Sequence, residues 1–239
     1  MGVTMTFAGQ AGFLFETETG LRVGVDLYLS DCCHRYFGFK RLLPYLFDPH
    51  TLNLDVLVAT HAHYDHFDPD SVPTILENAK TQMVAAYDVK TEAQKLGLPP
   101  RRFTYLSVGE TFACDGLRIT AMPCDHGKEN PHAIGLLIEI NGKTIYIAGD
   151  TAYRESYFRN PAVQHPDVFI MPINGAFGNL NEREGALAAS LVGATLTVPC
   201  HYWNFAEHGG NPQLFMEEMK NHCPDRPYVL MRPAESLTI

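Results

Sequence analysis

Apolar runs broken by glycine, proline and short polar segments divide the chain into predicted strands. Residues 5–16 and 21–28 are two apolar, partly alternating runs, and Thr17-Glu18-Thr19-Gly20 between them predicts a hairpin loop. The apolar run 54–59 is typical of a buried strand, and 81–86 predicts a shorter one. Further strands are predicted at residues 111–114, 117–122, 134–140, 143–148, 168–173, 194–198 and 228–231, the first two pairs joined by the hairpin turns Asp115-Gly116 and Asn141-Gly142.

Helices are predicted between the strands where a capping residue precedes a helical pattern. Asn181 and Glu184 resemble a capping box, and Gly193 then ends a helix at residue 191 or 192. The segment 37–47 mixes aromatic residues with Lys40 and Arg41, which fits either a short amphipathic helix or a lid over a pocket. The other predicted helices span residues 68–79, opened by Asp68-Pro69, 88–96, capped by Asp88, and 213–221, opened by Asn211-Pro212.

Length, composition and charge narrow the class of protein. A chain of 239 residues with 46% hydrophobic and 19% charged residues suits one globular domain, residues 1–239. The formal net charge of −9 argues against binding nucleic acid or an anionic membrane, although bound divalent ions leave an anionic small-molecule substrate open. The six cysteines form no regular framework, and we find no secretory signal or bilayer-spanning segment. We therefore expect a soluble, cytoplasmic protein.

The stretch Thr60-His61-Ala62-His63-Tyr64-Asp65-His66 places three imidazoles and a carboxylate directly after the predicted strand 54–59. In an extended backbone His61, His63 and Asp65 would share one face, and a turn after Asp65 would bring His66 to the same pocket. These donors suit zinc, manganese or iron(II). A solvated polar loop is the alternative, but four such donors seldom crowd together without a metal.

Three more candidate ligands each follow the carboxyl end of a predicted strand. They are His126, Asp150 and His201. Loops at one edge of a layered sheet converge, so we expect these residues to meet the early histidine cluster in one cleft. Seven nitrogen and oxygen donors exceed the needs of one tetrahedral ion and suit two ions that share a bridging carboxylate.

Other polar residues are assigned supporting positions. Asp26 stands inside an apolar strand, where a buried carboxylate needs a partner, and we expect it to hold a loop backbone or a histidine rather than a metal. Cys32-Cys33-His34 lacks a second pair at ligand spacing, so we predict no metal there. Cys124 and Cys200 are expected to pack beneath the site, with a thiolate ligand as the weaker alternative. Trp203 either walls the pocket or packs in the core.

Two divalent ions would generate hydroxide at neutral pH and meet the negative charge that develops on a substrate oxygen. Asp65 is predicted to orient the nucleophile and shuttle a proton, with Tyr64 and His208 as further catalytic candidates. Residues that flank the metal-bearing loops are predicted to contact a small polar or anionic substrate, or else to be solvated. The substrate-binding candidates are Lys128, His132 and Tyr202.

The same motifs resemble a known family along essentially the whole chain. The cluster 60–66, His126, Ala148-Gly149-Asp150-Thr151 and His201 together resemble the metallo-β-lactamase-fold hydrolase superfamily. More narrowly, Gly9-Gln10-Ala11-Gly12-Phe13-Leu14-Phe15 followed by Val25-Asp26-Leu27-Tyr28-Leu29-Ser30 is similar to the branch that contains L-ascorbate-6-phosphate lactonase and N-acylphosphatidylethanolamine phospholipase D.

The resemblance implies a four-layer α/β/β/α sandwich, in the α/β (α+β) class, with the metals at one edge. It implies that one ion is held by His61, His63 and His126, the other by Asp65, His66 and His201, and that Asp150 bridges them. True β-lactamases of the superfamily carry a cysteine where Asp150 stands, which disfavours antibiotic hydrolysis. Relatives are often multimeric, so a homo-oligomer stays open.

Three functions compete on this basis. The favoured hypothesis is a dinuclear zinc or manganese hydrolase, with iron also accepted, acting on a small ester or lactone with or without a phosphate group. A phosphodiesterase acting on a phospholipid or nucleotide is the second, although an acidic chain without an amphipathic membrane helix weakens it. A metal protein that does not hydrolyse, such as a redox protein or a sensor, is the third.

Overall fold

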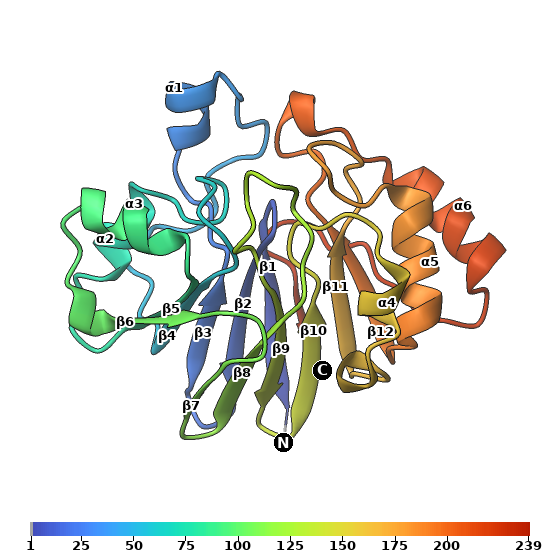
Figure 1. Ribbon diagram of the computed structural model, residues 1–239, viewed down its shortest axis with the longest axis horizontal. Helices are drawn as coiled ribbons and strands as arrows, with labels where there is room; N and C mark the ends of the chain where they lie inside the picture. Colours follow the sequence, from blue (N-terminus) through green and yellow to red (C-terminus); the bar gives the residue numbers. More distant parts are fainter. Residues whose placement is uncertain (1) are drawn as a thin grey trace.

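Two β-sheets pack face to face and carry helices on both outer faces (Figure 1). The computed structural model describes residues 2–239. These four layers confirm the predicted α/β/β/α sandwich. Of the helices in residues 2–239, none combines the length and apolar character needed to cross a bilayer.

The first sheet has seven strands and contains the N-terminal part of the chain. Its strands are β1 (Val3–Gly9), β2 (Gly12–Thr17), β3 (Arg22–Val25), β4 (Val56–Ala59), β5 (Gln82–Ala86), β6 (Phe103–Leu106) and β13 (Ser236–Thr238). They lie in the order β13-β1-β2-β3-β4-β5-β6, and β3 to β6 are parallel. Strands β4 and β5 are buried on both faces, because the second sheet covers one face and helices cover the other.

The second sheet has six strands. They are β7 (Thr111–Cys114), β8 (Leu117–Met122), β9 (Gly135–Ile140), β10 (Lys143–Ile147), β11 (Val168–Pro172) and β12 (Leu196–Cys200). Their order is β12-β11-β10-β9-β8-β7, with β10, β11 and β12 parallel and β9 antiparallel to both β8 and β10. Strands β8, β10, β11 and β12 therefore all end at the same edge of the sheet.

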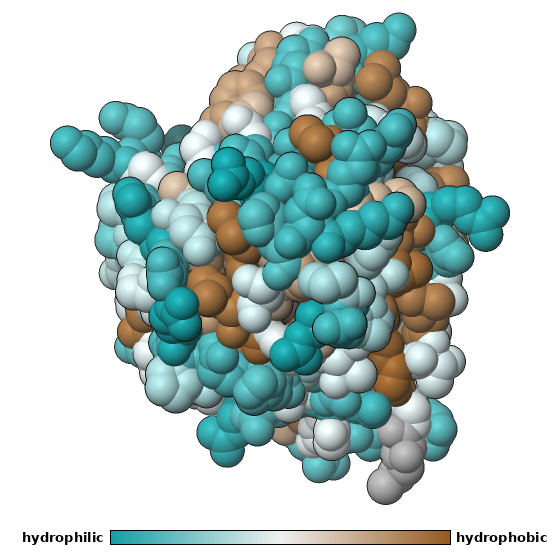
Figure 2. Space-filling model, turned by 90° about the vertical axis from the view of Figure 1, so that its right-hand side faces the viewer, coloured by the Kyte–Doolittle hydropathy of each residue, from teal (hydrophilic) through white to brown (hydrophobic). Residues whose placement is uncertain are grey.

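Six α-helices complete the layers. They are α1 (Cys32–Phe37), α2 (Ser71–Ile75), α3 (Val89–Lys95), α4 (Glu155–Phe158), α5 (Glu182–Val192) and α6 (Pro212–His222), with short 3₁₀ turns at Pro100–Arg102, Pro161–Val163 and Ala206–His208. Helices α2 and α3 cover the first sheet, whereas α4, α5 and α6 cover the second (Figure 1). The outer face with α5 and α6 is mostly hydrophilic, with hydrophobic residues scattered between (Figure 2).

The apolar pattern of β4 shows how the layers form. Val56 and Val58 point into the core between the two sheets, while Leu57 and Ala59 pack against the helices outside. All four residues are buried, which is why the run 54–59 shows no alternation. The capping box that opens α5 is also present, since Asn181 Oδ1 accepts from Glu184 N and Glu184 Oε2 accepts from Asn181 N.

Several predicted elements are wrong in their bounds. The run 5–16 is two strands, because the chain turns back at Gln10, whose φ is 53°, between Gly9 and Gly12. Residues 228–231 form no strand beyond one isolated bridge from Tyr228 to Thr197, and the chain instead ends in β13 beside β1. Strand β6 and helix α1 have no counterpart among the predictions.

The segment 37–47 is not the amphipathic helix that was one of its two predicted forms, although Phe37 and Phe39 do line a cavity, as a lid would. Helix α1 ends at Phe37, and Gly38 follows with a φ of 78°. The rest is irregular chain, which Arg41 holds by donating to the backbone oxygens of Tyr28 and Leu43. The aromatic residues in this segment therefore sit on a fixed loop rather than on a helical face.

The predicted helix 68–79 is wrong in its bounds, because α2 spans only Ser71–Ile75 and is preceded by Asp68. Its carboxylate is fully buried and accepts hydrogen bonds from the backbone of Leu29, Ser30, Asp70 and Ser71, and from both serine hydroxyls. One carboxylate thus fixes the loop after β3 against the start of α2.

Replacing this carboxylate should be costly. In Asp68→Ala several buried donors lose their acceptor, so we expect the free energy of unfolding to fall by about 3 kcal/mol or more. Asp70→Ala is the matched control, since its half-exposed pair with Arg35 should contribute less than about 1 kcal/mol. Urea unfolding followed by circular dichroism measures both. Equal losses in the two variants would contradict the anchoring role of Asp68.

Candidate metal centre

The loop after β4 turns instead of continuing as an extended strand. The backbone N–H groups of His66 and Phe67 both donate to the carbonyl oxygen of His63, at 2.9 and 2.7 Å. The predicted extended arrangement of His61, His63 and Asp65 is therefore wrong. The turn still brings all four side chains into the groups of possible metal ligands.

The second sheet delivers three more side chains from its strand ends. His126 follows β8, Asp150 follows β10, and His201 directly follows β12 with a φ of 63°. The N–H of His201 donates to the carbonyl oxygen of Gln10 at 2.8 Å, which ties this strand end to the β1–β2 turn of the other sheet. The predicted convergence of the later three residues on the early cluster is thus present.

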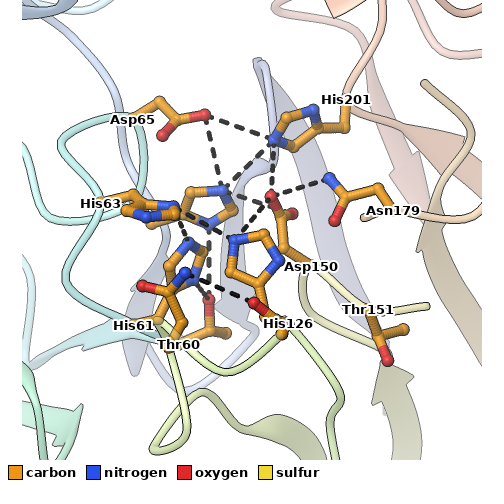
Figure 3. A network of polar contacts seen from close by, with 12 residues as sticks. Thr60, His61, His63, Asp65, His126, Asp150, Thr151, Asn179 and His201 are labelled. Atoms are coloured by element: carbon orange, nitrogen blue, oxygen red, sulfur yellow. Dashed lines mark hydrogen bonds and ion pairs between the residues drawn. The ribbon is translucent and has the colours of Figure 1, made fainter. Parts of the chain in front are cut away.

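The seven side chains form one contiguous cluster (Figure 3). Three groups each have one ligand atom per residue within 4.8 Å of the others, namely His61, His63 and His126, then His61, His66 and Asp150, then Asp65, His66 and His201. Asp150 lies between the outer groups, with Oδ2 3.1 Å from His201 Nε2 and 4.0 Å from His126 Nε2. All of these residues except His63 are buried.

The donor set suits cations. The Nε2 atoms of His61 and His126 lie 3.0 and 3.2 Å from His63 Nδ1, and the Nε2 atoms of His66 and His201 lie 3.3 Å apart. Two facing ring nitrogens can share only one proton between them, whereas a divalent ion bound there would accept a lone pair from each. The two buried carboxylates likewise need positive charge nearby.

Burial and neighbouring charge lower the pKa of some histidines in the cluster and raise the pKa of others. Burial, together with the charge on His66, holds the pKa of His61 well below its usual value, and burial lowers the pKa of His126 to about 4. For His66, burial acts in the same direction, but the carboxylates of Asp150, Asp26 and Asp65 outweigh it and raise the pKa. A neutral imidazole is the form that binds metals.

Asp26 supports the cluster from beneath, as expected. Its Oδ1 accepts from Thr60 N at 2.8 Å, and its Oδ2 accepts from Thr60 Oγ1 at 2.7 Å and contacts His66 Nδ1 at 2.9 Å. The carboxylate accepts the Nδ1 proton of His66 and leaves Nε2 toward the cluster. Asp26 therefore holds both a loop backbone and a histidine.

Two amide side chains that were not predicted from the sequence also reach the cluster. Gln10, on the β1–β2 turn, is 1% exposed, and its Nε2 lies 2.8 Å from Asp65 Oδ2 and 3.0 Å from His208 Nδ1. Asn179 donates to Asp150 Oδ2 at 2.8 Å. The Gly9-Gln10-Ala11-Gly12 turn was the available signal for Gln10, because a polar residue between two glycines interrupts an apolar run.

The catalytic candidates lie at the cluster. His208 is buried and stacks on His201 with ring centroids 5.0 Å apart, and burial lowers its pKa to about 4. The Tyr64 hydroxyl donates to Glu92 Oε2 at 3.2 Å while its ring faces the cavity beside the cluster. Asp65 Oδ2 lies 3.3 Å from His201 Nε2.

The substrate-binding candidates lie elsewhere. Lys128 and His132 are exposed, and the ring of His132 lies 5.8 Å from that of Tyr87. Tyr202 and Trp203 line a separate cavity, and Trp203 is 60% exposed rather than packed in the core. In the described part of the chain, these candidates do not line the cavity beside the cluster.

The expected packing role of the cysteines fits the geometry. The Cys124 thiol donates to the backbone oxygen of Asp150 at 3.0 Å, and burial raises its pKa. Cys200 is buried directly before His201. Both thiols support strand ends beneath the cluster.

A cavity of about 200 Å³ opens onto the cluster. Five of the seven candidate ligands line it, together with Cys33, Tyr64, His208 and three phenylalanines at positions 37, 39 and 177. A substrate in this cavity would meet the donor cluster on one side and aromatic rings on the other.

Comparisons with known proteins agree with this geometry. Residues 27–202 match the family model described as the beta-lactamase superfamily domain. A UPF0173 metal-dependent hydrolase of Korarchaeum cryptofilum is 28% identical over 238 residues, which is 98% of each chain. Another, from Nitratidesulfovibrio vulgaris, is 32% identical over 192 residues, covering 77% of this chain and 78% of that protein.

The fold also matches solved structures. Igni18, a metallo hydrolase from the archaeon Ignicoccus hospitalis, aligns with a TM-score of 0.80 at 21% identity, covering 100% of this chain and 99% of that one. At this identity the likeness concerns the fold.

The support from Asp26 can be tested through metal affinity. In Asp26→Asn the amide cannot accept all three hydrogen bonds, so His66 loses its fixed orientation and we expect metal affinity to fall by about 10- to 100-fold. Competition with a coloured chelator measures this. Asp167→Asn is the control, because Asp167 accepts from Thr144 N at 2.8 Å before β11, away from the cluster. Unchanged affinity in Asp26→Asn would refute the supporting role.

Proposed function

The chain belongs to the beta-lactamase superfamily and to its UPF0173 metal-dependent hydrolases, and from this we propose that it hydrolyses small esters or lactones with two divalent ions. One observation carries the proposal. Two groups of three donors flank the carboxylate of Asp150, which is the arrangement that two ions with a shared ligand require. The resemblance to the L-ascorbate-6-phosphate lactonase branch supports lactones as one substrate class.

The proposed ligand sets follow the clusters in space. His61, His63 and His126 would hold one ion, and Asp65, His66 and His201 the other, with Asp150 between them. Nitrogen-rich sites with carboxylates accept zinc, manganese or iron(II). Ions held there would polarise a carbonyl group and bring the pKa of water close to neutrality.

The protein's own residues would then guide protons. Asp65 keeps one carboxylate oxygen beside His201 and Gln10, and it is placed to accept a proton from the attacking water. Because the Gln10 amide donates to His208 Nδ1, the hydrogen of the neutral His208 ring is on Nε2. His208 lines the cavity, so this N–H is proposed to donate to the substrate oxygen on which negative charge develops.

The metal content of variants should distinguish residues that bind the ions from the residue that donates a proton. Purified wild-type protein should contain close to two ions per chain, and His61→Ala and Asp150→Ala should lose both metal and turnover. His208→Ala should keep its metal but lower kcat by about 10²- to 10³-fold, because only the donor to the oxyanion is lost. The exposed His50→Ala serves as the control for both readouts.

Elemental analysis by mass spectrometry and assays with esters, lactones and phosphodiesters measure these outcomes. Protein that stays metal-free after incubation with zinc and manganese would refute the proposal. Turnover of phosphodiesters with none of esters or lactones would identify a phosphodiesterase instead.

A further inference from the structure

An aromatic wall faces the donor cluster across the cavity. Its members are Phe37, Phe39, Tyr64 and Phe177, and each of them lines the cavity. The ring centroids of Phe37 and Tyr64 are 5.5 Å apart, those of Phe37 and Phe39 are 6.3 Å apart, and those of Phe39 and Phe177 are 5.7 Å apart. Residues from three separate connections between strands thus form one continuous apolar surface.

Two members of this wall are unusually exposed to solvent for large apolar side chains. Phe37 is 55% exposed and Phe177 is 57% exposed, although large apolar side chains are normally buried. Phe177 also has a φ of 56°, in the left-handed region that bulky residues rarely adopt. Such strain in an exposed residue beside a reactive cluster indicates a functional position.

The loop that carries Phe177 is fixed to the cluster. Asn179, two residues later, donates to Asp150 Oδ2, and Leu180 N donates to Thr151 O at 2.9 Å. The Phe177 ring lies 5.1 Å from the ring of His208. The aromatic ring is therefore held beside the group proposed to donate to the substrate.

Lysine and arginine side chains are absent from the cavity lining, all of which lies within residues 2–239. The guanidinium group of Arg41 is occupied by backbone oxygens, Arg154 pairs with Asp125 at 2.6 Å, and Lys128 is exposed outside the lining. A phosphate or carboxylate in this cavity would lose its hydration without gaining a cationic partner beyond the ions themselves.

We infer that the cavity takes a neutral substrate whose carbonyl group faces the donor cluster and whose apolar group, about the size of a benzene ring, packs against Phe37, Phe39 and Phe177. This assignment rests on the proposed hydrolysis of esters or lactones and names its substrate class. The size follows from the volume, since an apolar cavity of roughly 150 Å³ holds one benzene molecule, and about 200 Å³ leaves room for the scissile carbonyl. It disfavours a phosphorylated lactone.

Two γ-lactones that differ in one substituent test the assignment with the metal-loaded protein. One carries a phenyl ring and the other carries a phosphate group. We expect kcat/KM to be at least tenfold higher for the phenyl lactone. Phe177→Ala should lower that value about tenfold or more, mainly through KM, because a ring that packs on the substrate is lost. Leu214→Ala removes an exposed apolar side chain on α6 and should leave both values unchanged.

Binding of 4-phenyl-2-butanone, a neutral ketone that is not hydrolysed, gives a second readout by saturation-transfer NMR. Its binding should weaken in Phe177→Ala and persist in Leu214→Ala. Equal or faster turnover of the phosphate lactone would overturn the neutral-substrate assignment while leaving the hydrolase proposal intact. If neither lactone is hydrolysed but the ketone binds as expected, the pocket assignment stands and lactone hydrolysis is wrong. Failure of both readouts overturns both.

Discussion

The geometry of the candidate metal centre depends on one buried carboxylate, that of Asp26. It occupies a left-handed conformation, with a φ of 47°, at the end of β3, and there it accepts from both the backbone and the side chain of Thr60. Its contact with His66 Nδ1 fixes the direction of that ring. His66 Nε2 can then lie within 3.6 Å of ligand atoms from Asp65, Asp150 and His201, which join the two sheets at one point.

The candidate ligands were predictable because the rule that places them is local. A polar side chain within a few residues of the end of a buried strand lies at the sheet edge, whatever the details of the loop, and His126, Asp150 and His201 all follow this rule. The layers were predictable from the resemblance and from the apolar runs. The backbone conformation of the loop 60–66 was not, since the sequence cannot distinguish an extended segment from a turn where every residue is polar or small.

The two amides were not predicted, and the residues that flank His126 were predicted to lie at the cavity but do not line it. Gln10 and Asn179 act through contacts with residues far away in the sequence, and an amide in a loop has no distinctive pattern. Lys128 and His132 are close to His126 along the chain, but sequence proximity does not fix the direction of an exposed side chain. The aromatic wall lies on segments that connect the strands. The residues that would set substrate specificity can therefore vary, while the candidate ligands keep their places at the strand ends.

The hydrogen bond between His201 and Gln10 also has a consequence for how the protein is made. It joins residues 191 positions apart, and His66 precedes His201 by 135 positions. During synthesis the histidine-rich loop leaves the ribosome long before its later partners exist, and contacts of such separation form last because closing long loops costs entropy. The complete set of ligands thus arises only at the end of folding, and an ion captured earlier would meet half a site.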